Sequence, residues 1–139
     1  MANAPDIARG VARVLSDAGQ AVVRELPLAN GRRADLVALD RAGRITLVEI
    51  KSCRSDFRGD RKWQAYVEFC DHFYFAVASD FPCSLLPATE GLILADRYEG
   101  CIVREGRLRP LDAGRRKAML VRIAFASTAR LQALTDPSI

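Results

Sequence analysis

The chain has 139 residues, half of them hydrophobic and 27% charged, with 21 Lys and Arg against 17 Asp and Glu. This length and balance fit a single folded domain over residues 1–139 and exclude a largely disordered chain. The net charge of +4 permits nucleic-acid binding but does not establish it. No stretch resembles a membrane span or a secretion signal, so we expect a cytoplasmic protein with reduced thiols and no membrane contact.

The cysteine and histidine content makes neither a zinc site nor a histidine-dependent catalytic site an expected feature. The four cysteines form no CxxC pair, and His72 is the single histidine. His72 lies in the segment DHFYFAVA, which is typical of the start of a strand. We therefore expect it to pack at the core or an edge.

Apolar periodicity predicts the elements in chain order. Residues 4–18 have helical spacing, with Pro5 suited to the first turn and Gly19 to the end of the helix. The other expected elements are, in order, a strand at 20–28, two strands within 33–52, a helix at 60–70, strands at 72–78, 90–96 and 101–105, and a helix from Asp112 to about Leu134. This order predicts an α/β layer structure with a mixed sheet, in which the strands before and after the 60–70 helix are parallel.

The segment RADLVALDRAGRITLVEIKS, residues 33–52, predicts a hairpin whose open end carries charges. Its turn is three residues long and ends in Gly43, which occupies the left-handed region without steric cost. Counting back from this turn sets Asp35 opposite Glu49, with Cβ atoms about 4.5–5.5 Å apart. Because side chains alternate along a strand, Asp35, Glu49 and Lys51 share one face.

Two carboxylates this close raise each other's pKa unless a cation compensates them. Lys51 supplies one positive charge for two acids, so a divalent cation, Mg²⁺ or Mn²⁺, suits the pair better. The competing interpretation is that the acids meet solvent or pair with nearby arginines, namely Arg32, Arg33 and Arg44. For the three charged residues together we favour a functional site.

Asp35, thirteen further residues and then Glu49-Ile50-Lys51 resemble the PD-(D/E)xK nuclease motif. Ala34 stands where the motif has Pro, a position that supplies only backbone stiffness. The expected order of helix, three strands, helix and strand also resembles the core of that family.

A longer resemblance covers most of the chain. The segments RADLVAL, VEIKS, DFRGDRKWQAY, CDHFYFAV and GLILADRY are similar to those of the MmcB-type DNA repair proteins. This resemblance implies a restriction-endonuclease-like αβββαβ core with a mixed central sheet flanked by helices, followed by a C-terminal hairpin and helix. It also implies a magnesium-dependent deoxyribonuclease that acts on DNA in repair.

The resemblance assigns roles to individual residues. Asp35 and Glu49 would bind Mg²⁺ or Mn²⁺, and the backbone carbonyl of Ile50 would add a ligand. Lys51 would orient or help to deprotonate the attacking water and stabilise charge on the phosphate. Glu25 is either an additional metal ligand or an acid on the surface of an edge strand, and both interpretations stay open.

Further positions follow from the same resemblance. Gln64 and Tyr66 match a Gln and Tyr motif of RecB-type nucleases and would line the site, whereas Trp63 is expected in the core. The expected DNA-binding residues lie between Lys51 and the next helix, namely Arg54, Arg58, Arg61 and Lys62. The basic residues of the last helix are expected to form a solvated face, namely Arg115, Arg116, Lys117, Arg122 and Arg130.

An alternative is a nuclease-fold module without catalysis, which binds DNA or recruits repair proteins. A structural or metabolic α/β protein would require the motif to be a coincidence. A homodimer and repair-protein partners also stay open, because many nucleases of this fold dimerise to cut two strands.

Overall fold

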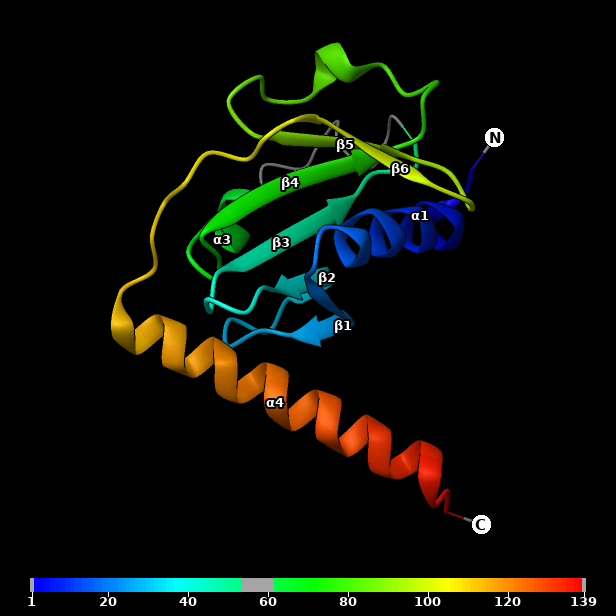
Figure 1. Ribbon diagram of the computed structural model, residues 1–139. Helices are drawn as coiled ribbons and strands as arrows, with labels where there is room; N and C mark the ends of the chain where they lie inside the picture. The colour runs from blue at the N-terminus through cyan, green and yellow to red at the C-terminus, as the bar shows by residue number, and fades with distance from the viewer. Residues whose placement is uncertain (1, 54–61, 139) are drawn as a thin grey trace.

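The computed structural model describes residues 2–53 and 62–138, and its elements follow the predicted order (Figure 1). They are α1 (Ala4–Asp17), β1 (Ala21–Pro27), β2 (Arg33–Leu39), β3 (Ile45–Ile50), α3 (Gln64–Val67), β4 (His72–Val77), the 3₁₀ helix η1 (Cys83–Leu85), β5 (Gly91–Ala95), β6 (Gly100–Arg104) and α4 (Ala113–Thr135).

All six strands belong to one mixed sheet with the strand order β1-β2-β3-β4-β5-β6. The first three strands are antiparallel, β3, β4 and β5 are parallel, and β6 pairs antiparallel with β5. The predicted mixed sheet, the parallel pairing of β3 with β4, and the final hairpin are therefore confirmed.

Helix α1 covers one face of the sheet (Figure 1). It begins where the side chain of Asn3 accepts the backbone N–H of Asp6 at 2.9 Å, an ordinary N-cap. Ile7 and Val11 are fully buried on its inner face. A Cβ atom at Gly10 would lie 2.1 Å from a backbone oxygen of the β5–β6 turn, so only glycine lets the helix approach this closely.

The opposite face of the sheet carries an aromatic cluster. Phe73 and Phe75 from β4 are fully buried, and the ring of Trp63 stacks on Phe73 with centroids 6.0 Å apart. Met119 and Ile123 of α4 close the cluster. Each such side chain contributes roughly 1.5–3 kcal/mol by burial, and the expected core role of Trp63 is confirmed.

Helix α3 is shorter than the helix expected at 60–70. Residues 54–61 lie outside the described part. Between residue 62 and β4, the α-helix spans only Gln64–Val67. The N–H groups of Phe69 and Cys70 then bond three residues back, to Tyr66 and Val67. This tighter winding ends the helix because the chain must enter β4 at His72.

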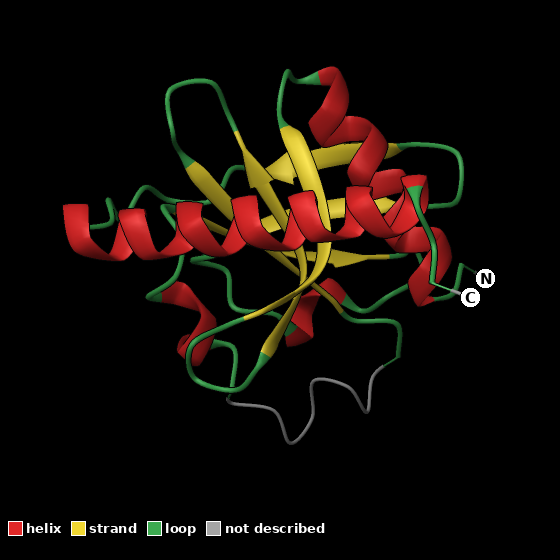
Figure 2. Ribbon diagram, turned by 90° about the horizontal axis from the view of Figure 1, so that it is seen from below, coloured by secondary structure: helices red, strands yellow, loops and turns green. Residues whose placement is uncertain are grey.

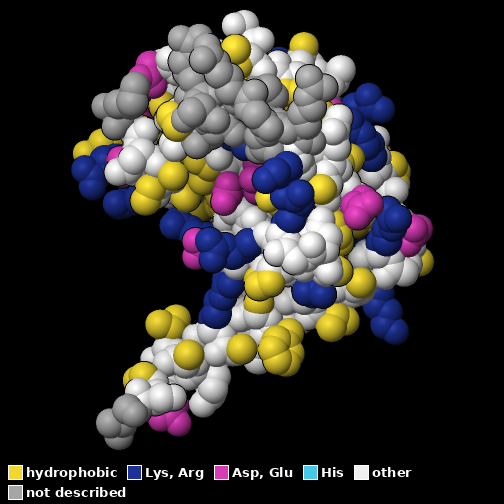
Figure 3. All heavy atoms as spheres, turned by 180° about the vertical axis from the view of Figure 1, so that it is seen from behind, with side chains coloured by type: hydrophobic (Ala, Val, Ile, Leu, Met, Phe, Trp, Pro, Cys, Tyr) yellow, Lys and Arg dark blue, Asp and Glu magenta, His cyan; other side chains and the backbone are white. Residues whose placement is uncertain are grey.

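Helix α4 lies beside β1 and crosses the molecule (Figure 2). Asp112 is its N-cap as predicted and accepts the N–H of Arg115 at 2.8 Å. Beyond the sheet the helix projects from the body and carries hydrophobic side chains (Figure 3). On α4, Phe125 is 78% exposed, and Leu131 and Leu134 are exposed as well.

Candidate active site

The turn of the β2–β3 hairpin has the predicted form. Gly43 has a φ of +88°, and Asp40 donates its N–H to the carbonyl of Arg44 at 3.1 Å. The Asp40 carboxylate accepts the N–H groups of Ala42 and Arg44, both at 2.9 Å, which holds the turn. The resulting register pairs Leu39 with Ile45 and Leu36 with Val48, as counted from the sequence.

The open end of this hairpin brings two carboxylates together. Glu49 accepts the backbone N–H of Asp35 on its Oε1 at 3.2 Å, and Asp35 accepts that of Ile50 on its Oδ2 at 2.8 Å. The side chains therefore reach across to each other's strand. Glu49 is 7% exposed, Lys51 is 6% exposed, and Asp35 is half-buried.

The charge at Asp35 is not fully compensated. Burial raises the pKa of Asp35, while the N–H of Ile50 and then the positive charges of Lys51 and Arg33 lower it. Burial prevails, so the pKa stays above its ordinary value. A carboxyl group in this state favours an additional cation.

The neighbouring arginines take other partners. Arg33 pairs with Glu25 at 3.7 Å, and Arg44 pairs with Asp71 at 3.9 Å. The charge of Arg32 acts on the hydroxyl of Tyr66 and lowers its pKa. The described residues show no ion pair between these arginines and Asp35 or Glu49, which was one half of the competing interpretation. The other half, that the acids meet solvent, stays open for the half-buried Asp35.

Of the two α3 residues predicted to line the site, Tyr66 lies near the acids. Burial, followed by the charges of Glu49 and Asp35, raises the pKa of Tyr66, and Arg32 opposes this shift. Gln64 begins the helix and is exposed. The structure thus brings Asp35, Glu49, Lys51 and Tyr66 near one another, whereas Gln64 is exposed.

Glu25 lies beside Asp35 in the register of β1 and β2, because the flanking pairs are Arg24–Leu36 and Leu26–Ala34. Its φ of +50° is unusual for a residue other than glycine. The carboxylate of Glu25 is 66% exposed and faces Arg33. No group of three or more His, Cys, Asp or Glu that could hold a metal occurs in the described residues. The role of Glu25 as an additional metal ligand remains a prediction.

The predicted DNA-binding residues are only partly described. Lys62 is exposed, whereas Arg54, Arg58 and Arg61 lie outside the described residues. The α4 arginines are not simply a solvated face, because several bond to the body of the protein: Arg116 to Asp71, Arg122 to the carbonyl of Pro27, and Arg130 to the carbonyls of Arg24 and Glu25. That expectation is corrected for these three side chains.

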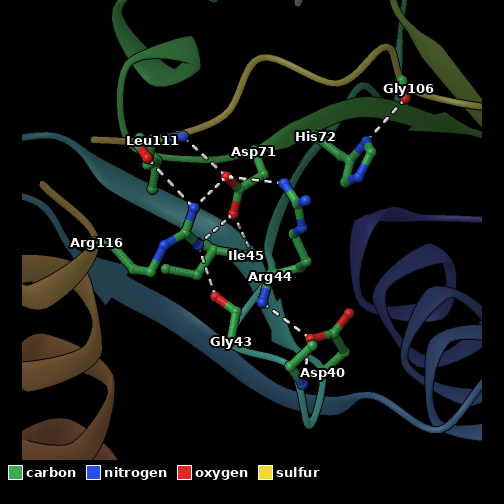
Figure 4. A network of polar contacts seen from close by, with 10 residues as sticks. Asp40, Gly43, Arg44, Ile45, Asp71, His72, Gly106, Leu111 and Arg116 are labelled. Atoms are coloured by element: carbon green, nitrogen blue, oxygen red, sulfur yellow. Dashed lines mark hydrogen bonds and ion pairs between the residues drawn. The ribbon is translucent and has the colours of Figure 1, made fainter. Parts of the chain in front are cut away.

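A second polar centre lies at the turn end of the hairpin and was not predicted from the sequence (Figure 4). Asp71 has no exposed side-chain surface and forms two hydrogen bonds with Arg116, at 2.7 and 2.8 Å. It also accepts the N–H groups of Ile45 at 2.8 Å and Leu111 at 2.9 Å. Burial alone would raise its pKa, but these bonds outweigh it and lower the pKa of Asp71 to about 2. An acid directly before a buried strand was the only sequence signal.

A similar pair anchors the segment that leads to α4. Glu90 is almost fully buried, and its carboxylate accepts both terminal nitrogens of Arg109 at 2.9 and 2.8 Å. Burial would raise the pKa of Glu90, but the bond from Arg109 prevails and lowers it. Both buried pairs are bidentate, which is the strong form of an arginine–carboxylate contact.

The fold and the position of the acids indicate the class of protein. A helix, three antiparallel strands, a helix and a parallel strand form the core of a restriction-endonuclease-like α/β fold, here extended by the β5–β6 hairpin and α4. A family model described as DNA repair protein MmcB-like matches residues 2–138. The chain therefore belongs to the MmcB-like DNA repair protein family, whose description indicates a role in DNA repair.

Other comparisons agree on the fold. A solved structure of a protein of unknown function from Silicibacter pomeroyi is 43% identical, with a TM-score of 0.93. The match covers 99% of this chain and 94% of that one. No curated protein matches the chain. Within residues 2–53 and 62–138, no helix has the length and apolarity needed to cross a membrane.

Proposed function

We propose that this protein is a metal-dependent deoxyribonuclease of the PD-(D/E)xK type that acts in DNA repair. The observation that carries the proposal is the paired arrangement of Asp35 and Glu49 across two strands, with the buried Lys51 two residues further along. A carboxyl group with a perturbed pKa, held on a rigid strand beside a second acid, is typical of catalytic sites.

The donor set fits a hard divalent cation. Asp35 and Glu49 would hold it through carboxylate oxygens, and the carbonyl of Ile50 would add a third oxygen. Mg²⁺ usually keeps several waters and needs only one or two carboxylates, so Glu25 is not required. When bound, such an ion supplies a more acidic water and neutralises phosphate oxygens.

Lys51 supplies the fixed positive charge of the site. Its backbone N–H bonds to the carbonyl of Ala76 at 3.0 Å, so β4 holds this end of the chain in place. Its charge lowers the pKa of Asp35, which supports a place for the ammonium group beside the acid. A lysine here would stabilise the negative charge that develops on a phosphodiester during cleavage.

Cleavage assays test this proposal directly. The protein is incubated with single-stranded and branched DNA in Mg²⁺ or Mn²⁺, and Lys51→Ala is compared with Lys117→Ala, which removes an exposed lysine on α4. We expect Lys51→Ala to cut about a hundredfold more slowly or worse, and Lys117→Ala to cut like the wild type. No cleavage of any substrate, or equal cleavage by both variants, contradicts the proposal.

Metal binding is measured separately by calorimetry. Asp35→Asn and Glu49→Gln keep the size of each side chain and remove one negative charge. We expect each to weaken Mg²⁺ or Mn²⁺ binding by about tenfold or more, a loss of at least ~1.4 kcal/mol. The control Asp17→Asn, at the exposed end of α1, is expected to leave binding unchanged.

The second candidate is a nuclease-fold module that binds DNA or recruits repair proteins without cutting. One observation favours it: Gln64, which the resemblance assigns to the site, is exposed. DNA binding without cleavage, together with metal binding that does not depend on Asp35, would support this candidate over the nuclease.

A further inference from the structure

The turn between β1 and β2 lies against α3 and holds Arg32 next to Tyr66. The N–H of Leu28 donates to the carbonyl of Arg32 at 2.8 Å and closes the turn. Asn30 accepts the N–H of Arg32 at 3.0 Å and donates its own side-chain N–H to the carbonyl of Ala65 at 3.3 Å. Because Ala65 directly precedes Tyr66, Asn30 couples the backbone of Arg32 to that of the tyrosine.

The side chains of Arg32 and Tyr66 also lie near each other. The charge of Arg32 acts on the Tyr66 hydroxyl and lowers its pKa, whereas the charges of Glu49 and Asp35 raise it. Burial and then the charge of Glu49 raise the pKa of Tyr66, so the hydroxyl keeps its proton at neutral pH. The pair therefore presents hydrogen-bond donors beside the two carboxylates.

Arg32 differs from its neighbours in the charge of its partner. Arg33 pairs with Glu25, and Arg44 pairs with Asp71. Arg32 is half-buried, and in the described part of the chain no carboxylate forms an ion pair with it. A neutral phenol does not offset the guanidinium charge, whose five N–H groups can donate to an anion.

We propose that Arg32 and the hydroxyl of Tyr66 form a subsite that binds a phosphate group of the DNA strand beside the bond that is cut. This inference rests on the proposed function and adds to it the residues that contact the substrate backbone. The forked guanidinium matches phosphate oxygens, and the hydroxyl adds another donor. The subsite would attract a phosphate to a place where the two carboxylates alone would repel it.

Binding of DNA tests the subsite without relying on cleavage. The full chain is titrated onto a fluorescent single-stranded oligonucleotide in Ca²⁺, which prefers oxygen ligands as Mg²⁺ does, at several salt concentrations. We expect Arg32→Gln to bind about tenfold more weakly, because a charged hydrogen bond contributes roughly 1.5–3 kcal/mol. We also expect the slope of log affinity against log salt to fall by about 0.7 in magnitude, since one phosphate contact is lost.

Matched variants distinguish the loss of a phosphate contact from a general change in charge or in the folded structure. Arg33→Gln makes the same change in net charge next door and is expected to alter affinity less than about twofold. Arg32→Lys keeps the charge and loses the fork, so it should keep the salt slope and recover part of the affinity. Adding Tyr66→Phe to Arg32→Gln should weaken binding by less than the product of the two single effects, because both groups act on one phosphate.

The outcomes also separate this inference from the nuclease proposal. Wild-type affinity and salt slope in Arg32→Gln overturn the subsite, and so does a wild-type chain that binds no DNA. Arg32-dependent binding without any cleavage removes the nuclease and supports the subsite. Cleavage at equal rates by Arg32→Gln and wild type removes the subsite alone. Urea unfolding of every variant confirms that the folded protein is compared.

Discussion

A carboxylate lies near arginines at each end of the β2–β3 hairpin, yet the two environments differ in charge balance. At the turn end, Asp71 lies against Arg116 and two backbone N–H groups, and its pKa is lowered to about 2. At the open end, Asp35 lies beside Glu49, and burial raises its pKa. The bonds to Asp71 outweigh the effect of its burial, whereas the bond and charges at Asp35 do not.

This difference separates a structural acid from a candidate functional one. Arg116 also donates to the carbonyl of Gly43 at 2.7 Å, so the network of Asp71 attaches α4 to the turn of the hairpin. At Asp35 the charge of Lys51 reaches the carboxylate but does not offset its burial. Acids whose pKa is raised by burial are candidates for ligand binding or catalysis.

The largest expected effect is a difference in stability between two equivalent substitutions. Asp71→Asn should lower the free energy of unfolding by about 3–5 kcal/mol, because it leaves the guanidinium of Arg116 without its counter-charge. Asp35→Asn should change stability by less than about 1 kcal/mol, since it removes a charge that burial disfavours. Urea unfolding of both variants measures the difference, and equal losses would contradict this distinction between the two ends.

A second expected difference is in metal binding as a function of pH. Protons compete with the cation for Asp35, whose raised pKa brings this competition closer to neutral pH. Mg²⁺ or Mn²⁺ affinity should fall by up to about tenfold per pH unit below that pKa. Calorimetry over a pH series measures the fall. An affinity that does not change down to pH 4 would show that Asp35 is not a ligand.

Acid unfolding should depend on the opposite end of the hairpin. The unfolded chain binds a proton at Asp71 near the ordinary pKa of about 3.9, whereas the folded protein binds it only at about 2. The stability that Asp71 contributes is therefore complete above about pH 4 and is lost as the pH falls toward 2. Asp71→Asn should show a smaller loss over this interval, measured by circular dichroism at constant salt.

The smallest expected effect concerns the turn that sets the register. Gly43→Ala places a Cβ atom at a φ of +88° and should cost about 1 kcal/mol, although nothing lies within 4 Å of that position. Gly114→Ala, in the first turn of α4, should be neutral or stabilising by up to about 1 kcal/mol. Thermal unfolding compares the two, and a neutral Gly43→Ala would mean that the turn tolerates the change.

The shared face of the charged residues could be predicted because it depends on local rules. A three-residue turn ending in Gly43 sets the register, and strand alternation then places Asp35 across from Glu49. Neighbours in a hairpin are close in sequence, so turn length and period-two patterning were sufficient. The N-cap at Asp112 was equally local.

Partner choice was decided by the tertiary structure. Arg116 reaches Asp71 across 45 residues, and no pattern along the chain distinguishes it from the other basic residues of α4. The charge of Arg32 acts on Tyr66 only because the β1–β2 turn lies against α3. Composition and spacing determined that acids and arginines would be plentiful near the hairpin. Which of them neutralise one another depends on distance and burial, and these exist only once the helices have packed on the sheet.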